Sequence, residues 1–507
     1  MKQRKYWLSM ALMGLASYSF AQNETDVLRY SQTQPAGTAR SLGIGGATVS
    51  LGADLGSLST NPAGLGLYRG SEFTFTPGLG VGNTDSRIDG VTSSDNRNSL
   101  HVASLGMVFA NRRPDSEDNP WRGGTLAFGL TRVNDFNAAF RYQHKPALNQ
   151  DLLSYLNRNP TTQQETGLDD LAYQTFLTEE DAQGLFVPQD FENAGPLTQT
   201  ETVLNTGSQT QFDFGYGASY RDKLYLGGAI GILSTRFNST KTFNATDPSP
   251  ATPNEPGTAF STVDFRETLK VRGTGINARF GAIYQPVDAV RIGASVQTPT
   301  YMQLSENFTS TMDVKFDRTV TVDGQDYNEA NAGSEGEYDY ALVSPFRASG
   351  GATVVIGKFG FLSGDVEYVN YGQGRLSNTS DNEGTNNATD FSSQNDAVRA
   401  GYKQAINLRV GGEARLDIFR LRAGFARYGD PYKLENGDRS QNYITGGVGL
   451  RQKNFFLDAA GVYATARQYY SPYTFYKANG AVDSDRTPIV NIESSRFTTS
   501  ITAGFLF

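Results

Sequence analysis

Apolar and polar residues alternate along most of this chain, in segments of about ten residues or more. Within 211–220, apolar and aromatic side chains occupy every second position, with polar residues or glycine between them. Within 406–416, the positions between the apolar residues include Arg409, Glu413 and Arg415. Such charges on one strand face are costly in a dry sandwich core but suit a water-filled or plugged lumen. A soluble sheet with a solvated face explains one such strand, but it explains less well a pattern that recurs throughout.

The pattern predicts an all-β fold, a transmembrane antiparallel β-barrel. About 14 alternating segments can be counted, and an even number is typical of single-chain bacterial barrels. The expected strands are 72–82, 98–110, 123–143, 207–220, 223–242, 259–286, 288–316, 337–357, 359–372, 400–417, 418–430, 441–452, 453–469 and 493–507.

The connections between these strands alternate in length. Short turns are expected at Arg221-Asp222, near 286–288 and at Gly357-Lys358. The long polar connections are 83–97, 144–206, 243–258, 317–336, 373–399, 431–440 and 470–492. The exception is 111–121, where a longer segment replaces a tight turn. Because bacterial barrels keep short turns on the periplasmic side and long loops outside, this order favours a barrel over a sandwich.

The largest outer connection, 144–206, has a pattern of its own. Leu152, Leu153 and Leu156 recur at helical spacing, and a similar run follows within 168–176. We expect short amphipathic helices that cap the outer mouth of the barrel.

The N-terminus is typical of an exported chain. Lys2, Arg4 and Lys5 precede a short apolar stretch, and Ser19 and Ala21 are the small residues that a signal peptidase requires. The apolar stretch is too short for a membrane anchor. We therefore predict a cleaved signal peptide over 1–21 and location in the outer membrane of a Gram-negative bacterium.

The segment 22–71 does not alternate and is rich in glycine and alanine. Its run 43–47 weakly matches a dinucleotide-binding loop, but no buried strand precedes it and no βαβ unit follows. Small residues are favoured where backbones approach closely. We interpret 22–71 as a plug, or hatch, inside a barrel that extends over 72–507.

Composition excludes several classes of protein. Hydrophobic residues make up 38% of the 507 residues, and the mean hydropathy is −0.43. Polar groups interrupt every later apolar run, so no transmembrane helix is expected. The chain has no cysteine and two histidines, and serine occurs in no Gly-x-Ser-x-Gly elbow. The net charge of −8 is dispersed, without a basic stripe. We expect no enzyme activity, no cofactor, no metal site and no nucleic-acid partner.

One motif connects these features to a known family. The hatch motif Asn61, Pro62, Ala63 and Gly64 resembles the plug motif of the FadL-type outer-membrane transporters, which carry long-chain fatty acids and other hydrophobic compounds. The C-terminal Phe507, which ends an alternating segment, is similar to the signal read by the outer-membrane barrel assembly machinery. The chain thus resembles a FadL-type protein, and specifically a Bacteroidetes-like member.

The resemblance implies passive transport of a hydrophobic small molecule. Ligand would be captured at the outer loops, enter a luminal pocket closed by the hatch, and leave sideways into the bilayer through a kink in the third strand. The hatch motif would lie beside that strand. The candidate kink and lateral opening are Val133, Asn134, Asp135 and Phe136, where the apolar alternation is interrupted. The candidate outer capture surface is Leu152, Leu153, Leu156 and Phe186, although local packing is the favoured interpretation of these residues.

The resemblance also implies partners, and it leaves alternatives open. The expected partners are outer-membrane lipid and lipopolysaccharide, the hydrophobic ligand and the assembly machinery, with the barrel as a monomer. A FadL-like barrel also serves type IX secretion in Bacteroidetes-type bacteria, which would make this chain a protein-interaction barrel. A polar-solute porin is the other alternative, but a plug argues against an open aqueous lumen.

Overall fold

The computed structural model describes residues 24–114, 116–147, 149–157, 167–180, 186–188, 197–248, 260–379, 390–433, 437–477 and 482–507. The expected signal peptide lies outside these residues. No helix in the described ranges is both long and apolar enough to cross a bilayer.

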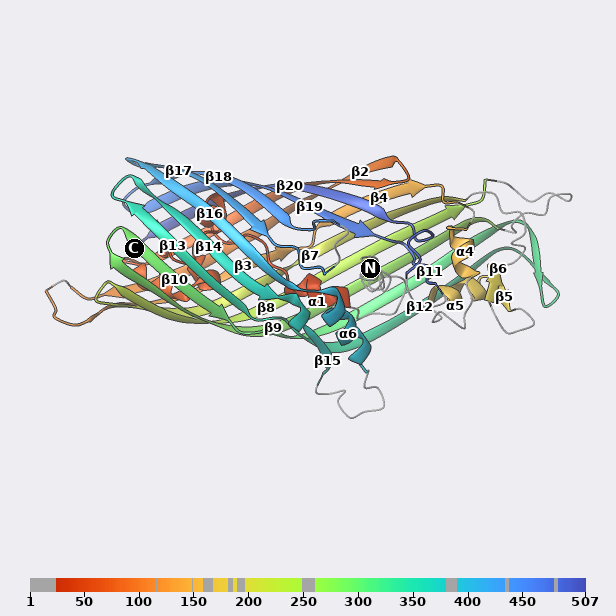
Figure 1. Cartoon of the computed structure of the whole chain (residues 1–507), viewed down its shortest axis with the longest axis horizontal. Helices are drawn as coiled ribbons and strands as arrows, with labels where there is room; N and C mark the ends of the chain where they lie inside the picture. The colour runs from red at the N-terminus through yellow and green to blue at the C-terminus, as the bar shows by residue number, and fades with distance from the viewer. Residues whose placement is uncertain are drawn as a thin grey trace, which may run out of the picture.

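The strands close into one antiparallel barrel (Figure 1). The first strand pairs with the second on one side and with the last on the other, where Glu72 lies opposite Leu506. The wall consists of β1 (Glu72–Ile88), β2 (Val91–Arg112), β3 (Trp121–Asp135) with β4 (Ala138–His144), β7 (Thr198–Tyr220), β8 (Leu224–Thr246), β9 (Phe260–Val287), β10 (Val290–Gln297) with β11 (Tyr301–Val322), β12 (Gln325–Val343) with β13 (Arg347–Ile356), β14 (Gly360–Asn370) with β15 (Arg375–Asn378), β16 (Gln404–Leu416), β17 (Phe419–Tyr428), β18 (Gln441–Arg451), β19 (Phe455–Tyr470) and β20 (Val490–Leu506). Counted with each interrupted strand taken once, the described residues form 14 strands, which confirms the predicted architecture.

The outer face of the barrel is apolar and the inner face is polar. On β9, Phe280 is 59% exposed while its neighbour Arg279 is 3% exposed, and on β8 Ile230 is 55% exposed. A soluble protein would bury the phenylalanine and expose the arginine. The inverted arrangement is that of a wall whose outside contacts lipid.

Two of the expected long loops are strands. The segments 83–97 and 317–336 extend the ladders of β1–β2 and β11–β12 to the two-residue turns Asp89-Gly90 and Asp323-Gly324. All four turn residues have positive φ, between 48° and 80°, as hairpin turns of this kind require. The prediction was wrong there because both faces of these hairpins are polar, so the alternation that identifies a membrane strand is absent.

Apart from these two hairpins, the long connections lie at the end of the barrel opposite the short turns (Figure 1). At the end with the long connections, the chain forms α4 (Leu152–Leu156), α5 (Gly167–Gln174), and the small sheet of β5 (Thr178–Glu180) and β6 (Phe186–Pro188). The short helix η3 (Tyr371–Gln373) leads into the expected connection 373–399, which includes β15 and most of α6 (Ser392–Gly401). The helices predicted in the largest outer loop are therefore present.

The described residues that precede β1 form short helices joined by coil inside the barrel (Figure 1). They are α1 (Glu24–Ser31), α2 (Ala39–Gly43), α3 (Ser57–Thr60) and the 3₁₀ helix η2 (Pro62–Leu67). We call residues 24–71 the plug.

Candidate functional site

The side chain of Asn61 binds the plug to itself and to the wall. Its Oδ1 caps η2 by accepting a hydrogen bond from the Ala63 amide at 3.1 Å. Its Nδ2 donates to the carbonyl oxygen of Val49 in the plug at 2.7 Å. The same nitrogen lies 3.3 Å from the carbonyl oxygen of Ala282 and 3.2 Å from that of Ala294, on β9 and β10. The two N–H groups of this amide are thus shared among carbonyl oxygens of three separate segments.

The wall opposite the hatch motif is lined with glycine. A Cβ atom at Gly227 on β8 would lie 2.5 Å from the Ala63 amide nitrogen, and one at Gly217 on β7 would lie 2.6 Å from that of Gly66. These glycines let η2 approach the strand backbone directly. The hatch motif therefore lies against β7 to β10. The same helix also contacts β3, where Leu65 packs in one cluster with Ala127, and Leu55 and Leu58 of the plug reach Gly129.

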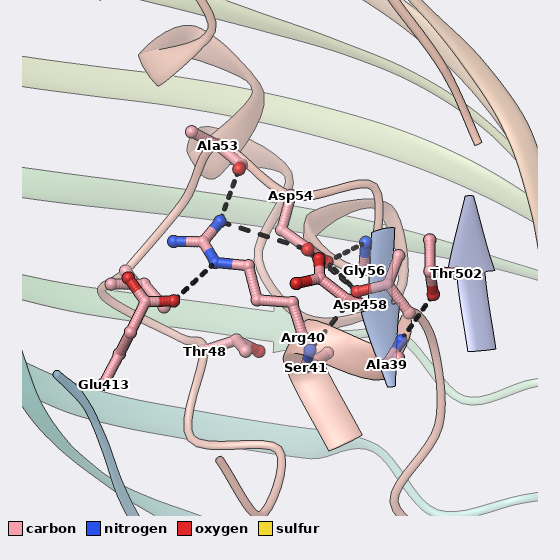
Figure 2. Close-up of polar contacts among 12 residues, drawn as sticks. Ala39, Arg40, Ser41, Thr48, Ala53, Asp54, Gly56, Glu413, Asp458 and Thr502 are labelled. Atoms are coloured by element: carbon pink, nitrogen blue, oxygen red, sulfur yellow. Dashed lines mark hydrogen bonds and ion pairs between the residues drawn. The ribbon is translucent and has the colours of Figure 1, made fainter. Parts of the chain in front are cut away.

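Arg40 joins the plug to the barrel wall (Figure 2). Its Nη1 donates to the Ala53 carbonyl oxygen at 2.7 Å. Its guanidinium nitrogens lie 4.0 Å from a carboxylate oxygen of Asp54 and 3.7 Å from one of Glu413 on β16. Burial acts to lower the pKa of Arg40, but the carboxylates of Glu413 and Asp54 outweigh burial and raise that pKa. Arg40 is therefore a permanent cation between two acids.

The network continues into the wall. Glu413 also accepts from Nε of Arg422 at 2.9 Å and from Nε of Arg415 at 3.0 Å, and Arg422 Nη1 contacts Asp458 at 2.7 Å. The charged face of 406–416 thus faces a plug that supplies compensating charge, which is the setting that the sequence pattern indicated.

The plug also contacts the third strand at the predicted kink. The backbone N–H of Gln34 donates to the Val133 carbonyl oxygen at 3.0 Å, and Nδ2 of Asn134 donates to the backbone carbonyl oxygen of Gln32 at 3.0 Å. Tyr30 of α1 packs edge-on against Phe136, with ring centroids 5.9 Å apart. The residues singled out as a kink are therefore the ones that the N-terminal segment touches.

The third strand is interrupted at this place. Its ladder with β2 runs from the pair Arg112–Gly123 to the pair Ser104–Thr131 and stops. A register shift follows between Arg132 and Asn134, and β3 ends at Asp135, before β4 resumes the pairing with β7. In the described structure, β2 residues 91–103 have no ladder partner on the third strand. We call the boundary between 91–103 and 132–144 the seam.

A polar cluster centred on Asp135 spans the seam. Its carboxylate oxygens lie 3.0 Å from Arg496 Nη1 on β20 and 3.3 Å from Arg132 Nη2, and one accepts from the Ser99 hydroxyl on β2 at 3.3 Å. The guanidinium of Arg496 reaches Asp135 across β1 by passing over Gly80 and Gly82. Sequence reasoning identified Asp135 but missed its partners, because Arg496 and Ser99 carry no local signal.

A cavity of about 340 Å³ lies inside the barrel between α1, α5 and the strands β8, β9 and β11. Phe140, Phe237, Phe265 and Leu269 give it apolar walls. Lys241 Nζ lies 3.4 Å from Glu267 within the lining. The cavity is therefore amphiphilic, and it lies between the outer-loop helices and the part of the plug that touches the third strand.

The leucines expected at an outer capture surface are buried. Leu152, Leu153 and Leu156 are 1–2% exposed and pack with Phe243 and Phe260 in one apolar cluster. They form the core under the outer loop, so the packing interpretation holds for them. Phe186 lies at the start of β6, and its side chain is outside the described residues.

Together these features define a class: a plugged outer-membrane β-barrel with an internal amphiphilic cavity. No protein-family model and no curated protein matches the sequence. The Ralstonia pickettii toluene transporter TbuX has a similar structure, with a TM-score of 0.52 and 16% identity, over 95% of this chain and 100% of that one. A Pseudomonas aeruginosa FadL homologue gives a TM-score of 0.51 at 12% identity, over 93% and 98%. The Pseudomonas putida toluene transporter TodX gives 0.51 at 12% identity, over 94% and 100%. The resemblance to FadL-type proteins is thus confirmed at the level of the fold.

Proposed function

We propose that this protein transports hydrophobic small molecules passively across the outer membrane. Ligand enters the cavity beside α1 from the outer loops and leaves sideways through the seam into the bilayer, while the plug blocks the axial route. The observation that carries the proposal is the seam, because the wall there lacks a hydrogen-bonded ladder and touches the plug. A closed barrel has no structural need for such a break.

The layout of the lumen supports a lateral route over an axial one. Asn61 and Arg40 anchor the plug to the wall. The strands opposite η2 carry glycines, so the backbone of η2 packs directly against the strand backbone. An open porin needs an aqueous lumen along its whole length, which the plug occupies. Several similar structures are named as toluene transporters, and aromatic hydrocarbons have the apolar character that the cavity walls would accept.

A cross-link across the seam tests the route. The native chain has no cysteine, so Ser99→Cys with Asp135→Cys can be joined by a short, reducible thiol cross-linker. The matched control is Ala466→Cys with Ser494→Cys, a register pair within the intact ladder of β19 and β20. Uptake of radiolabelled toluene and decanol is measured in proteoliposomes and in cells that lack the endogenous transporter.

We expect the seam cross-link to abolish uptake, reduction to restore it, and the control cross-link to leave it unchanged. Full uptake through the cross-linked seam would refute the lateral route. Failure of the untreated wild-type protein to accelerate uptake of either compound would refute transport itself.

A further inference from the structure

The cavity beside α1 is lined by two ion pairs and by one further carboxylate that belongs to neither pair. Asp26 pairs with Arg29 within α1, and Lys241 pairs with Glu267 across β8 and β9. The fifth charged residue in the lining is Glu306 on β11. The cations of the cavity are therefore already engaged by carboxylates.

Glu306 is buried and without a hydrogen-bond partner in the described structure. The residue is 0% exposed, and neither of its carboxylate oxygens has a donor within reach. A buried acceptor left unsatisfied bears its full desolvation cost. Since a cavity large enough for a small ligand lies directly beside it, a donor on that ligand would remove the cost.

The residues around Glu306 indicate the chemical class of the ligand that carries this donor. Phe237, Phe265 and Phe308 line the same cavity, and the guanidinium of Arg29 lies over the Phe237 ring at 4.4 Å. An apolar body would be buried against these rings. An anionic head group, by contrast, would approach Glu306 with no cation free to compensate it.

We infer that the cavity selects apolar molecules that carry a hydrogen-bond donor, a hydroxyl or an amine, and that it rejects the carboxylate anion of an otherwise similar molecule. Glu306 accepts the donor and sets this preference. The inference rests on the proposed function, because it names the substrate class of the same lumen.

The test uses three ligands that share one ring and differ in head group. 4-Ethylphenol supplies a donor, 4-ethyltoluene replaces it with a methyl group, and 4-ethylbenzoate is an anion. Their binding to the full-length protein in detergent is measured by titration calorimetry. The variant Glu306→Leu removes the acceptor, and Glu306→Gln keeps an acceptor without the charge. The control Glu337→Leu changes an exposed residue next to Asn307 in the β11–β12 register.

The wild-type protein is expected to bind 4-ethylphenol at least tenfold more tightly than the other two ligands. In Glu306→Leu, the affinities for the phenol and the hydrocarbon become equal. Glu306→Gln still binds the phenol but also binds the benzoate. In Glu337→Leu, all three affinities stay as in the wild-type protein. Variants are compared only after each shows the heat-modifiable migration of a folded barrel. Equal affinity of the wild-type protein for phenol and hydrocarbon, or tighter binding of the benzoate, overturns the inference but leaves hydrophobic transport standing. If none of the three ligands binds and uptake is also absent, the proposed function fails together with the inference.

Discussion

A close approach of the plug backbone to the wall gives a sharp prediction. The substitution Gly227→Ala adds one methyl group to β8 that would lie 2.5 Å from the Ala63 amide nitrogen. Ordinary contact needs roughly 3.5 Å, so η2 must move by about 1 Å or the strand must bend. The obstacle is backbone on both sides, which cannot rotate away as a flexible side chain can.

The cost of this overlap falls on the docking of the plug. Overpacking by a methyl group typically costs about 1–3 kcal/mol, which corresponds to a shift of about 5- to 150-fold between docked and undocked plug. The hydrogen bonds from Asn61 to the carbonyl groups of Ala282 and Ala294 weaken as η2 moves away. The barrel ladders do not pass through η2 and should stay intact.

The adjacent residue supplies a matched control. A Cβ at Gly228 would point to the other face of β8, 3.6 Å from the ring of Phe280, which is an ordinary contact. Single-channel recordings in planar bilayers should show frequent open events for Gly227→Ala and rare ones for both wild type and Gly228→Ala, at equal thermal stability of the barrel. The reasoning is refuted if Gly227→Ala conducts like wild type while remaining folded, or if Gly228→Ala opens equally often.

The remaining predictions concern the anchors, the seam and the outer loop. Arg40→Met removes the cation that joins Asp54 of the plug to Glu413 of the wall and should destabilise plug docking by about 3 kcal/mol. Calorimetry should show a lower transition temperature, and Arg40→Lys should recover part of the loss. Asn61→Ala should weaken docking by about 1–3 kcal/mol and raise protease cleavage within the plug, whereas unchanged cleavage would contradict the role of this amide. Asp135→Asn releases Arg496, so amide hydrogen exchange in 91–103 should rise about tenfold, equivalent to about 1.4 kcal/mol, with no rise in the β17–β18 ladder. Leu153→Ala should lower the stability of the outer loop by about 2–5 kcal/mol without changing the affinity of the protein in detergent for its ligand. A loss of affinity at unchanged stability would restore the capture interpretation.

The candidate site was predictable where a local pattern marks it. The break at 133–136 was visible because it interrupts a regular alternation. The hatch motif was visible only through its resemblance to the plug motif of a known family, and the structure shows that Asn61 caps a short helix there. The hairpin tips at Asp89-Gly90 and Asp323-Gly324 were missed because their strands are polar on both faces. The outer leucines were ambiguous because helical spacing does not distinguish a buried face from a binding face.

The sequence alone determined the closed barrel, because lipid imposes a period of two on the membrane-spanning part of each strand. Only the tertiary structure decided which luminal residues meet. Arg40 with Glu413, Arg496 with Asp135 and Glu306 with the cavity are pairings between distant parts of the chain. They depend on strand register and on how the plug docks, and alternation specifies which face a residue occupies but not which residue lies across the lumen.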